Sequence, residues 1–287
     1  MRPVCASIRR ARPLLGTFVE MAVAGAHRSK MEEAVEAAFA AVAEVHRLMS
    51  VQESASDVAR VNRESAMRAV IVHPWTFEVL EAALDLQNRS GGIFDIVAAP
   101  ALRNGSRSRN IELLPGGRVR LPSPDATIDL GGIAKGFAVD RAIAVLRDHD
   151  VPQGLVNAGG DLAAFGRDAV VVSLRDPREP RRIMGHVEID GGALASSGRR
   201  VDPFECWETK ETEVIDVRTS RPARAAIGAT VRAGRCMIAD ALAKVVIVAG
   251  EAAASVLAEY SASALFVSPN GDLHVSDNWQ NPVHLAA

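Results

Sequence analysis

The sequence predicts an α+β fold in which antiparallel-rich sheets are packed by helices. Long amphipathic segments indicate helices in the first half of the chain and near its end, whereas short apolar runs separated by glycine-rich or proline-rich turns dominate residues 154–233. The strands and helices do not follow the steady alternation of a doubly wound sheet. Because no proline- or serine-rich linker divides the chain, we expect residues 1–287 to form one domain, or two intimately packed subdomains.

The first half is predicted to contain one strand followed by two long helices. Apolar and small residues in LLGTFVEMAV indicate an opening strand over residues 14–23. Apolar residues recur at spacings of three and four between Met31 and Met49, which predicts the first helix. Pro74 at its start and Gly91-Gly92 at its end delimit the second. The basic stretch RNGSRSRN, residues 103–110, has few apolar residues and is predicted to be a solvated loop.

The second half begins with a strand over Thr127–Leu130 and a helix from about Phe137 to His149. Short strands are then predicted at GLVNA, AVVVSL, HVEI, EVIDV and ATVRA. The end of the chain is expected to form a helix through MIADALAKVVIV, a second helix over residues 251–260 and a hairpin around SPNGD.

Composition excludes several classes of protein. With 48% apolar and 24% charged residues and a formal charge of −2, the chain has no electrostatic footprint for a nucleic acid.

Cys5, Cys206 and Cys236 are odd in number and widely spaced, which favours free thiols in a reducing compartment. The N-terminal segment lacks the continuous apolar stretch of a signal peptide, and no run approaches the roughly 20 apolar residues of a transmembrane helix. We therefore expect a cytoplasmic protein without a transmembrane segment. Its oligomeric state is not indicated.

Two glycine-rich turns are candidates for a phosphate site. In IDLGGIAKGFAVD, amides at a helix N-terminus would attract a phosphate that Lys135 would neutralise. The stretch matches neither the P-loop nor the GxGxxG pattern, so a tight packing corner explains it equally well on its own. NAGGDLAAFG, residues 157–166, repeats the arrangement of a strand that runs into glycines beside a carboxylate. Two such turns would be able to line one cleft.

A third candidate is Asp240, which lies in the apolar helical context IADALAKV. A carboxylate in such a place is costly unless it is paired, hydrogen-bonded or bound to a cation. A helix cap or a salt bridge would satisfy it. The alternative is a ligand for a hard metal such as Mg²⁺, which takes oxygen donors.

Seven segments form a pattern that covers nearly the whole chain, from about Arg12 to Gly250: LLGTFVEM, SGGIFDIVAAP, IDLGGIAKGFAVD, NAGGDLAAFG, ALASSG, EVIDVRT and MIADALAKV. In order and approximate spacing they resemble the FAD:protein FMN transferase (ApbE) family. The resemblance implies an ApbE-like mixed fold and a transferase. Such an enzyme would cleave FAD with Mg²⁺ and attach FMN through a phosphoester to a Thr or Ser of a target flavoprotein.

The resemblance also implies roles for particular residues. Gly132, through its backbone carbonyl, and Asp240, through its carboxylate, would hold Mg²⁺. Lys135 and Glu213 would be catalytic, because the lysine and the metal would offset charge on the leaving phosphate and the glutamate would accept a proton. The residues implied to bind FAD are Leu15, Ile93, Phe94, Asp95, Asp129, Lys135 and Val214.

Two motifs depart from the family pattern. The family's HxIDPxTG is EVIDVRTS here, so that Glu213 replaces a histidine; its unperturbed pKa of about 4.3 is far from neutrality unless burial raises it. Family members carry a Thr three or four residues after the aspartate, where this chain has Ala243 and Lys244. A hydroxyl ligand is thus lost. An inward Lys244 would occupy or repel the cation, whereas on a helix the same side chain is equally able to extend to solvent. Two alternatives stay open: a protein that binds FAD without transfer, and an FAD pyrophosphatase that releases FMN and AMP.

Overall fold

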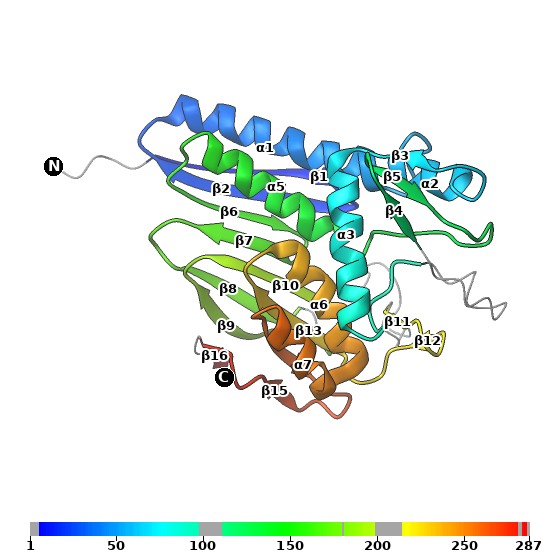
Figure 1. Cartoon of the computed structure of the whole chain (residues 1–287). Coiled ribbons are helices and arrows are strands. Elements are labelled where there is room, and N and C mark those ends of the chain that lie inside the picture. Colours follow the sequence, from blue (N-terminus) through cyan, green and yellow to red (C-terminus); the bar gives the residue numbers. More distant parts are fainter. Residues whose placement is uncertain (1–5, 98–110, 180, 199–213, 281–282, 286–287) are drawn as a thin grey trace.

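The structure is a computed structural model that describes residues 6–97, 111–179, 181–198, 214–280 and 283–285. At its centre is an eight-stranded sheet in which every neighbouring pair is antiparallel (Figure 1). In spatial order its strands are β1 (Ala6–Leu14), β2 (Thr17–Gly25), β6 (Gln153–Ala158), β7 (Asp161–Phe165), β10 (Gly192–Gly198), β13 (Gly228–Ala233), β14 (Ser263–Val267) and β15 (Leu273–Val275).

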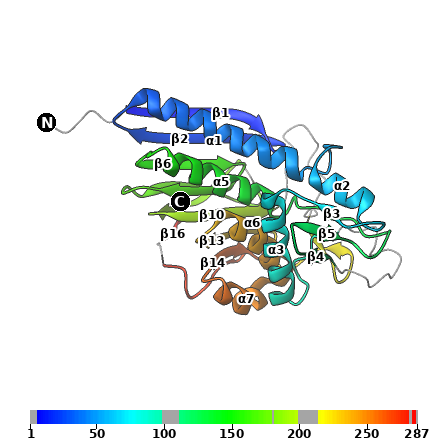
Figure 2. The same cartoon turned by 45° about the horizontal axis from the view of Figure 1, so that its top comes forward.

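Three long helices cover one face of this sheet, α1 (Arg28–Met49), α5 (Ala134–Asp148) and α6 (Cys236–Ala249), with α5 between the other two (Figure 2). They bury the main core, which includes Met21 on β2, Phe39 on α1 and Phe137 on α5. Burial of apolar side chains between sheet and helices is the chief stabilisation of such a layered fold. After α6 the chain continues through a 3₁₀ turn, η1 (Gly250–Ala253), into the short helix α7 (Ala254–Glu259).

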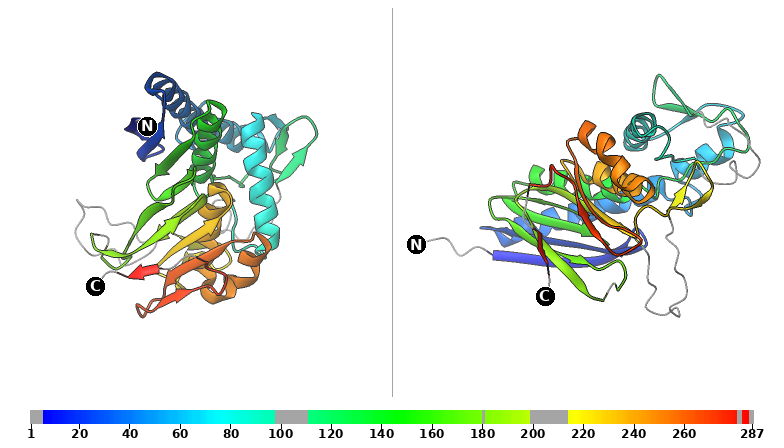
Figure 3. Two further views of the ribbon diagram at one scale, coloured as in Figure 1. Left: turned by 90° about the vertical axis from the view of Figure 1, so that its left-hand side faces the viewer. Right: turned by 90° about the horizontal axis from the view of Figure 1, so that it is seen from below.

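A smaller sheet packs on the opposite face, with the strand order β16 (Val283–Leu285), β9 (Ile183–Ile189) and β8 (Val170–Arg175) (Figure 3). Leu162 and Leu194 of the large sheet and Val187 of the small one belong to a second, smaller core between them. The large sheet is therefore covered on both faces, by helices on one and by strands on the other.

The remaining elements lie at one end of the sheet. They comprise α2 (Asp57–Glu64), α3 (Pro74–Arg89), the sheet β3 (Val70–Ile71), β5 (Arg118–Arg120) and β4 (Glu112–Leu114), and the hairpin β11 (Ile215–Asp216) and β12 (Arg221–Pro222). Helix α3 packs on the starts of α5 and α6, because its Trp75 ring lies edge-on to Phe137 and its Glu78 pairs with Arg235 at 2.7 Å.

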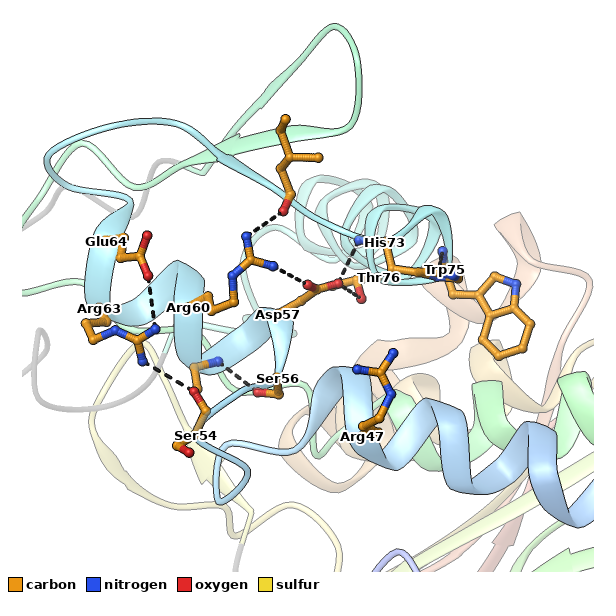
Figure 4. A network of polar contacts seen from close by, with 12 residues as sticks. Arg47, Ser54, Ser56, Asp57, Arg60, Arg63, Glu64, His73, Trp75 and Thr76 are labelled. Carbon is orange, nitrogen blue, oxygen red and sulfur yellow. Dashed lines mark hydrogen bonds and ion pairs between the residues drawn. The ribbon is translucent and has the colours of Figure 1, made fainter.

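A buried aspartate ties α2 to the start of α3 (Figure 4). Asp57 Oδ2 accepts hydrogen bonds from the His73 backbone N–H at 2.7 Å and from the Thr76 hydroxyl at 2.8 Å, while Oδ1 accepts from Arg60 at 3.0 Å. The adjacent Ser56 caps α2 by accepting from the Ala59 N–H at 3.0 Å. Because His73 and Thr76 both donate to the Asp57 carboxylate on α2, the entry to α3 is fixed relative to α2.

The predicted α+β class is confirmed, and the long helices and the hairpin around SPNGD lie where the pattern placed them. The single opening strand over residues 14–23 is wrong. Two strands, β1 and β2, meet at a turn formed by Leu15 and Gly16, whose φ angles are 57° and 69°. Glycine adopts such angles readily, but leucine rarely does. The apolar run therefore did not indicate a turn.

The strand expected over Thr127–Leu130 is also wrong, because this segment forms only a single bridge between Ile128 and Val97. Instead, Asn62 of α2 binds both sides of the Ile128 peptide: its Oδ1 accepts from the Ile128 N–H at 2.7 Å and its Nδ2 donates to the Ile128 carbonyl at 2.9 Å. A side chain from a distant helix thus takes the place of a neighbouring strand.

Smaller differences concern element ends. Helix α5 begins at Ala134 rather than near Phe137, so Lys135 lies in its first turn. The strand expected at EVIDV is limited to Ile215–Asp216, and the helix over residues 251–260 is divided between η1 and α7. The basic loop over residues 103–110 lies outside the described residues.

Within the part of the chain that the structure describes, one helical stretch, Cys236–Glu259, is long and apolar enough to cross a membrane. More than half of its most apolar window is buried inside the protein, where α6 packs on the large sheet and on α5. This is weak evidence for a membrane span, because the core helix of a globular domain has the same length and composition.

Candidate active site

Two lysines and two aspartates meet where the first turn of α5 approaches α6. The Lys135 ammonium of α5 pairs with Asp161 Oδ2 at the start of β7, and the Lys244 ammonium of α6 pairs with Asp240 Oδ1 one turn earlier on the same helix. Lys135 Nζ is also 4.0 Å from Asp240 Oδ1, which joins the two pairs. We call these four residues the charge cluster.

The carboxylates form the buried side of the charge cluster and the ammoniums its accessible side. The side chains of Asp161 and Asp240 are 1% and 0% exposed, against 34% for Lys135 and 19% for Lys244. Buried carboxylates need such partners, because an unpaired charge in the interior is strongly destabilising. Although the four formal charges cancel, an anion that approaches from the solvent meets the lysines first.

Burial and neighbouring charges alter the ionisation of the charge cluster. Burial and the negative charge of Asp240 raise the pKa of Asp161 to about 6, although both lysines act in the opposite direction. For Lys135, burial lowers the pKa, but the carboxylates of Asp240 and Asp161 outweigh this effect and raise it above its ordinary value. Lys135 is therefore a permanent cation near neutral pH.

Hydrogen bonds between α5 and α6 set the position of the charge cluster. The Gly136 N–H in the first turn of α5 donates to Asp240 Oδ2 at 3.0 Å. In return, Asp140 of α5 accepts from the first two amides of α6, Cys236 at 2.7 Å and Met237 at 3.0 Å. Burial raises the pKa of Asp140, and these two backbone bonds act against that rise. Asp140 thus supplies the N-terminal cap that the residue before α6, Arg235, does not provide.

Asp140→Ala is expected to lower the free energy of unfolding by about 2 kcal/mol, because two amides at a buried helix end lose their acceptor. Urea denaturation measures this change. Asp148→Ala, at the exposed C-terminal end of the same helix, is the matched control and should change stability by less than about 0.5 kcal/mol. Equal effects of the two substitutions would show that the interhelical cap contributes little.

Gly132 and Phe94, two of the residues singled out in the sequence, lie against the charge cluster. A Cβ atom placed on Gly132 would lie 3.5 Å from Cε2 of the buried Phe94 ring and 3.9 Å from Cε of Lys244. The Lys244 side chain therefore passes beside Gly132 before it reaches Asp240. Lys244 thus lies beside both residues predicted to bind a metal: its Cε is close to Gly132, and its ammonium pairs with Asp240.

Leu15 lies in the β1–β2 turn, beside a contact between this hairpin and the second glycine-rich turn. The residue after that turn is Thr17, and its Oγ1 would lie only 2.5 Å from a Cβ placed on Gly159, so the hairpin packs on the glycine turn that leads into Asp161. Leu15 itself is partly buried against the main core with a strained, positive φ of 57°. Strain of this kind in a well-packed structure is often retained at binding sites.

Asp95 and Asp129 shape the backbone of the two segments that contain Phe94 and Gly132. Asp95 Oδ1 accepts from the Val97 N–H at 2.9 Å, and Asp129 Oδ1 accepts from the Gly131 N–H at 2.7 Å. Asp129 is exposed, and its own N–H donates to the Ile96 carbonyl at 2.8 Å, which joins the two segments. Both carboxylates thus stabilise turns that lead to Phe94 and Gly132.

The other predicted site residues are less directly placed. Ile93 and Val214 are partly buried against the main core, and the Val214 carbonyl accepts from the Ala223 N–H at 2.9 Å. Glu213 lies outside the described residues. Of the three cysteines, Cys236 is a buried free thiol, and Cys5 and Cys206 are likewise outside the described residues.

Asp161 is a member of the charge cluster that was noted in the sequence only as a carboxylate beside two glycines. The signal that would have identified it is its position as the one charged residue in a strand, DLAAF, whose five residues are all buried. Its Oδ1 atom is buried without a hydrogen-bond partner among the described residues. Such a carboxylate needs a cation, which Lys135 supplies.

A groove of about 740 Å³ lies on the far face of the large sheet, beside β8 and β9. Its lining includes Thr17 and, from the second glycine-rich turn, Gly160 and Leu162, but none of the residues to which the resemblance gives a role in catalysis, FAD binding or metal binding. Leu162 lines this groove, whereas its neighbour Asp161 points to Lys135 on the helical side. The groove and the charge cluster thus lie on opposite faces of one strand, and the chemically competent groups are those on the helical side.

The donors at the charge cluster do not fit a divalent cation. Asp240 already accepts from Lys244 on one oxygen and from the Gly136 N–H on the other. Over the described residues, no three His, Cys, Asp or Glu side chains are grouped as metal ligands would be. Mg²⁺ prefers six oxygen donors, whereas here one ammonium pairs with Asp240 Oδ1 and a second lies 4.0 Å from it.

The fold and the charge cluster define an α+β protein in which one lysine in the first turn of α5 and one lysine of α6 lie together, a site suited to a ligand that carries phosphate. The chain belongs to the ApbE family, whose family model matches residues 15–266.

Curated relatives share this family. The FAD:protein FMN transferase of Treponema pallidum is 26% identical, with 93% of this chain and 86% of that protein covered. The FAD:protein FMN transferase of Rhodobacter capsulatus is also 26% identical over 83% of this chain, which spans only half the length of that relative.

Solved structures support the fold. A crystal structure of an ApbE protein from Thermotoga maritima superimposes with a TM-score of 0.83 at 24% identity, covering 96% of this chain and 98% of that one. The apo form of the flavinyl transferase ApbE from Pseudomonas stutzeri gives 0.80 at 22% identity, with 96% of both chains covered. At these identities the likeness establishes a shared architecture.

Proposed function

We propose that this protein transfers FMN from FAD to a Thr or Ser of a target flavoprotein. The observation that supports it most strongly is the pair of ammoniums, Lys135 and Lys244, held by buried carboxylates in a chain that belongs to the ApbE family. A pyrophosphate is the part of FAD that such a pair would recognise. The relatives named above are FAD:protein FMN transferases, which gives the proposal its substrate.

In the proposed reaction the acceptor hydroxyl oxygen attacks the phosphorus on the FMN side of the pyrophosphate. A P–O bond forms to the acceptor, the P–O bond to AMP breaks, and the hydroxyl proton passes to a base. FMN-acceptor, AMP and one proton are the products, and no electron is transferred. Lys135 and Lys244 would stabilise negative charge that develops on the phosphoryl oxygens. Glu213 is proposed as the base.

The remaining parts of the proposal concern binding and location. We assign contacts with FAD to Leu15, Ile93, Phe94, Asp95, Asp129 and Val214, together with Lys135. A flavoprotein with a Thr or Ser flavinylation motif is the proposed partner, and the cytoplasm the proposed location. Mg²⁺ dependence, which the resemblance implies through Gly132 and Asp240, is the one part that the donors of the charge cluster do not support.

The test is to incubate the purified protein with FAD and an acceptor carrying the family's Thr or Ser motif. Intact-mass spectrometry of the acceptor should show an increase that corresponds to FMN, and chromatography should show AMP in equal amount. An acceptor whose Thr or Ser is replaced by Ala is the control. AMP release without a change in acceptor mass would identify a pyrophosphatase, and FAD binding with neither would identify a carrier; either result contradicts transfer.

A further inference from the structure

We propose that the Lys244 ammonium takes the position of the divalent cation in this protein, so that the phosphate-binding site works with two lysines and no metal. The inference rests on the proposed function only for the identity of the anion, the pyrophosphate of FAD. The pairing of Lys244 with Asp240 rests on the geometry alone, and the cation position is the one that the resemblance implies at Gly132 and Asp240.

The position of Lys244 is the first argument. It lies four residues after Asp240 on α6, so both side chains project from the same face of the helix. Its Cε is close to Gly132, and its ammonium pairs with Asp240 Oδ1. Lys244 therefore lies beside Gly132 and occupies Oδ1 of Asp240, the oxygen that a metal ion would otherwise be able to take.

Charge is the second argument. Asp161 and Asp240 carry two negative charges, and Lys135 and Lys244 already balance them. A divalent ion bound to Asp240 would lie close to two ammoniums. It would also add two positive charges to the charge cluster, whose four formal charges already cancel. Because Asp240 is fully buried, one cation is required at its Oδ1, but the lysine and a metal ion cannot both provide it.

The accessible surface of the two lysines is the third argument. The Lys244 ammonium contacts Asp240 Oδ1, and the Lys135 ammonium lies 4.0 Å from the same atom. Both lysine side chains are partly exposed. They are therefore able to bind two oxygens of one pyrophosphate, as compact charges with several donors each. A lysine fixed by a buried carboxylate supplies this charge without the dehydration that Mg²⁺ requires.

Binding of Mn²⁺, a spectroscopic substitute for Mg²⁺, tests the inference without reference to activity. Free Mn²⁺ is titrated by electron paramagnetic resonance against the full chain, against Lys244→Thr and against Lys30→Thr. The last is the matched control, because Lys30 is an exposed lysine on α1. We expect no site in the starting protein or the control below about millimolar Mn²⁺, and binding at least about tenfold tighter in Lys244→Thr, where a hydroxyl joins Asp240.

Two further variants keep the test decisive. Lys244→Ala removes both the charge and the side chain that reaches Asp240, so it should also bind Mn²⁺ more tightly than the starting protein, even if Lys244→Thr fails to fold. Adding Asp240→Asn to Lys244→Thr should abolish the new site. Stoichiometric Mn²⁺ binding by the starting protein, as tight as in Lys244→Thr, would overturn the inference.

Turnover gives a second and separate readout. AMP release from FAD by the starting protein should change by less than about twofold when EDTA replaces Mg²⁺, whereas Lys244→Thr should need Mg²⁺ for turnover. Loss of the starting protein's activity in EDTA would contradict the inference. If no turnover is seen under any condition, the proposed function fails, and the Mn²⁺ titration still decides whether Lys244 holds the cation position.

Discussion

Lys135→Ala is expected to lower the rate of AMP release from FAD by about a hundredfold to a thousandfold. Enzymes lose about this much activity when one preorganised hydrogen-bond donor to a developing oxyanion is removed. Lys135 lies in the first turn of α5, paired with Asp161 and 4.0 Å from Asp240. Its ammonium is therefore already oriented before FAD binds. Initial rates of AMP release, measured by chromatography at saturating FAD, give the result.

The same substitution has a structural effect that must be separated from the chemical one. Without Lys135, the Asp161 carboxylate is buried and unpaired, which is expected to lower the free energy of unfolding by about 3 kcal/mol. The double variant Lys135→Met with Asp161→Asn removes both charges and should recover most of this stability in urea denaturation. Its rate of AMP release should stay as low as that of Lys135→Ala.

This pair of variants distinguishes two roles for Lys135. If stability and turnover recover together in the double variant, the lysine acts only by neutralising Asp161. If stability recovers and turnover does not, the ammonium acts on the substrate. Lys30→Ala, on the exposed face of α1, should change neither quantity and controls for the loss of one surface-accessible lysine.

Much of the fold could be predicted because its signals are local. The three-and-four spacing of apolar residues in α1 and the Pro74 and Gly91-Gly92 signals around α3 mark helices that form where the pattern places them. The turn at Leu15 carries no such signal, since leucine is an unusual residue at a φ of 57°. The segment near Ile128 is held by Asn62, which is 66 residues away, and no local pattern reports such a contact.

The site shows the same division between local and distant signals. Lys135 beside a glycine turn and Asp240 in an apolar helix could be singled out because each is a charge in an unusual sequence context. Their partners could not, because Asp161 is 26 residues from Lys135, and the Gly136 N–H that binds Asp240 is 104 residues away. Whether Lys244 points inward or to solvent was open for the same reason, since a lysine on a helix is able to do either.

Gly136 is the residue where the smallest change is expected to have the largest effect on stability. A Cβ atom at this position would lie 2.3 Å from the Cys236 carbonyl oxygen and 2.8 Å from the Met237 Cα. These are backbone atoms of α6, so no side chain is able to move away, and α5 and α6 must separate. Separation would also lengthen the hydrogen bonds from Gly136 to Asp240 and from Cys236 to Asp140.

Gly136→Ala should therefore lower the free energy of unfolding by about 3 kcal/mol or more, the upper range for overpacking in a core. Helix propensity alone predicts the opposite sign, because alanine in a helix is favoured over glycine by about 1 kcal/mol. Urea denaturation measures the change, with Gly234→Ala as control, since a Cβ there meets no atom within 4 Å. A variant as stable as the starting protein would show that the two helices are not in close contact at Gly136, and that the charge cluster does not depend on this contact for its geometry.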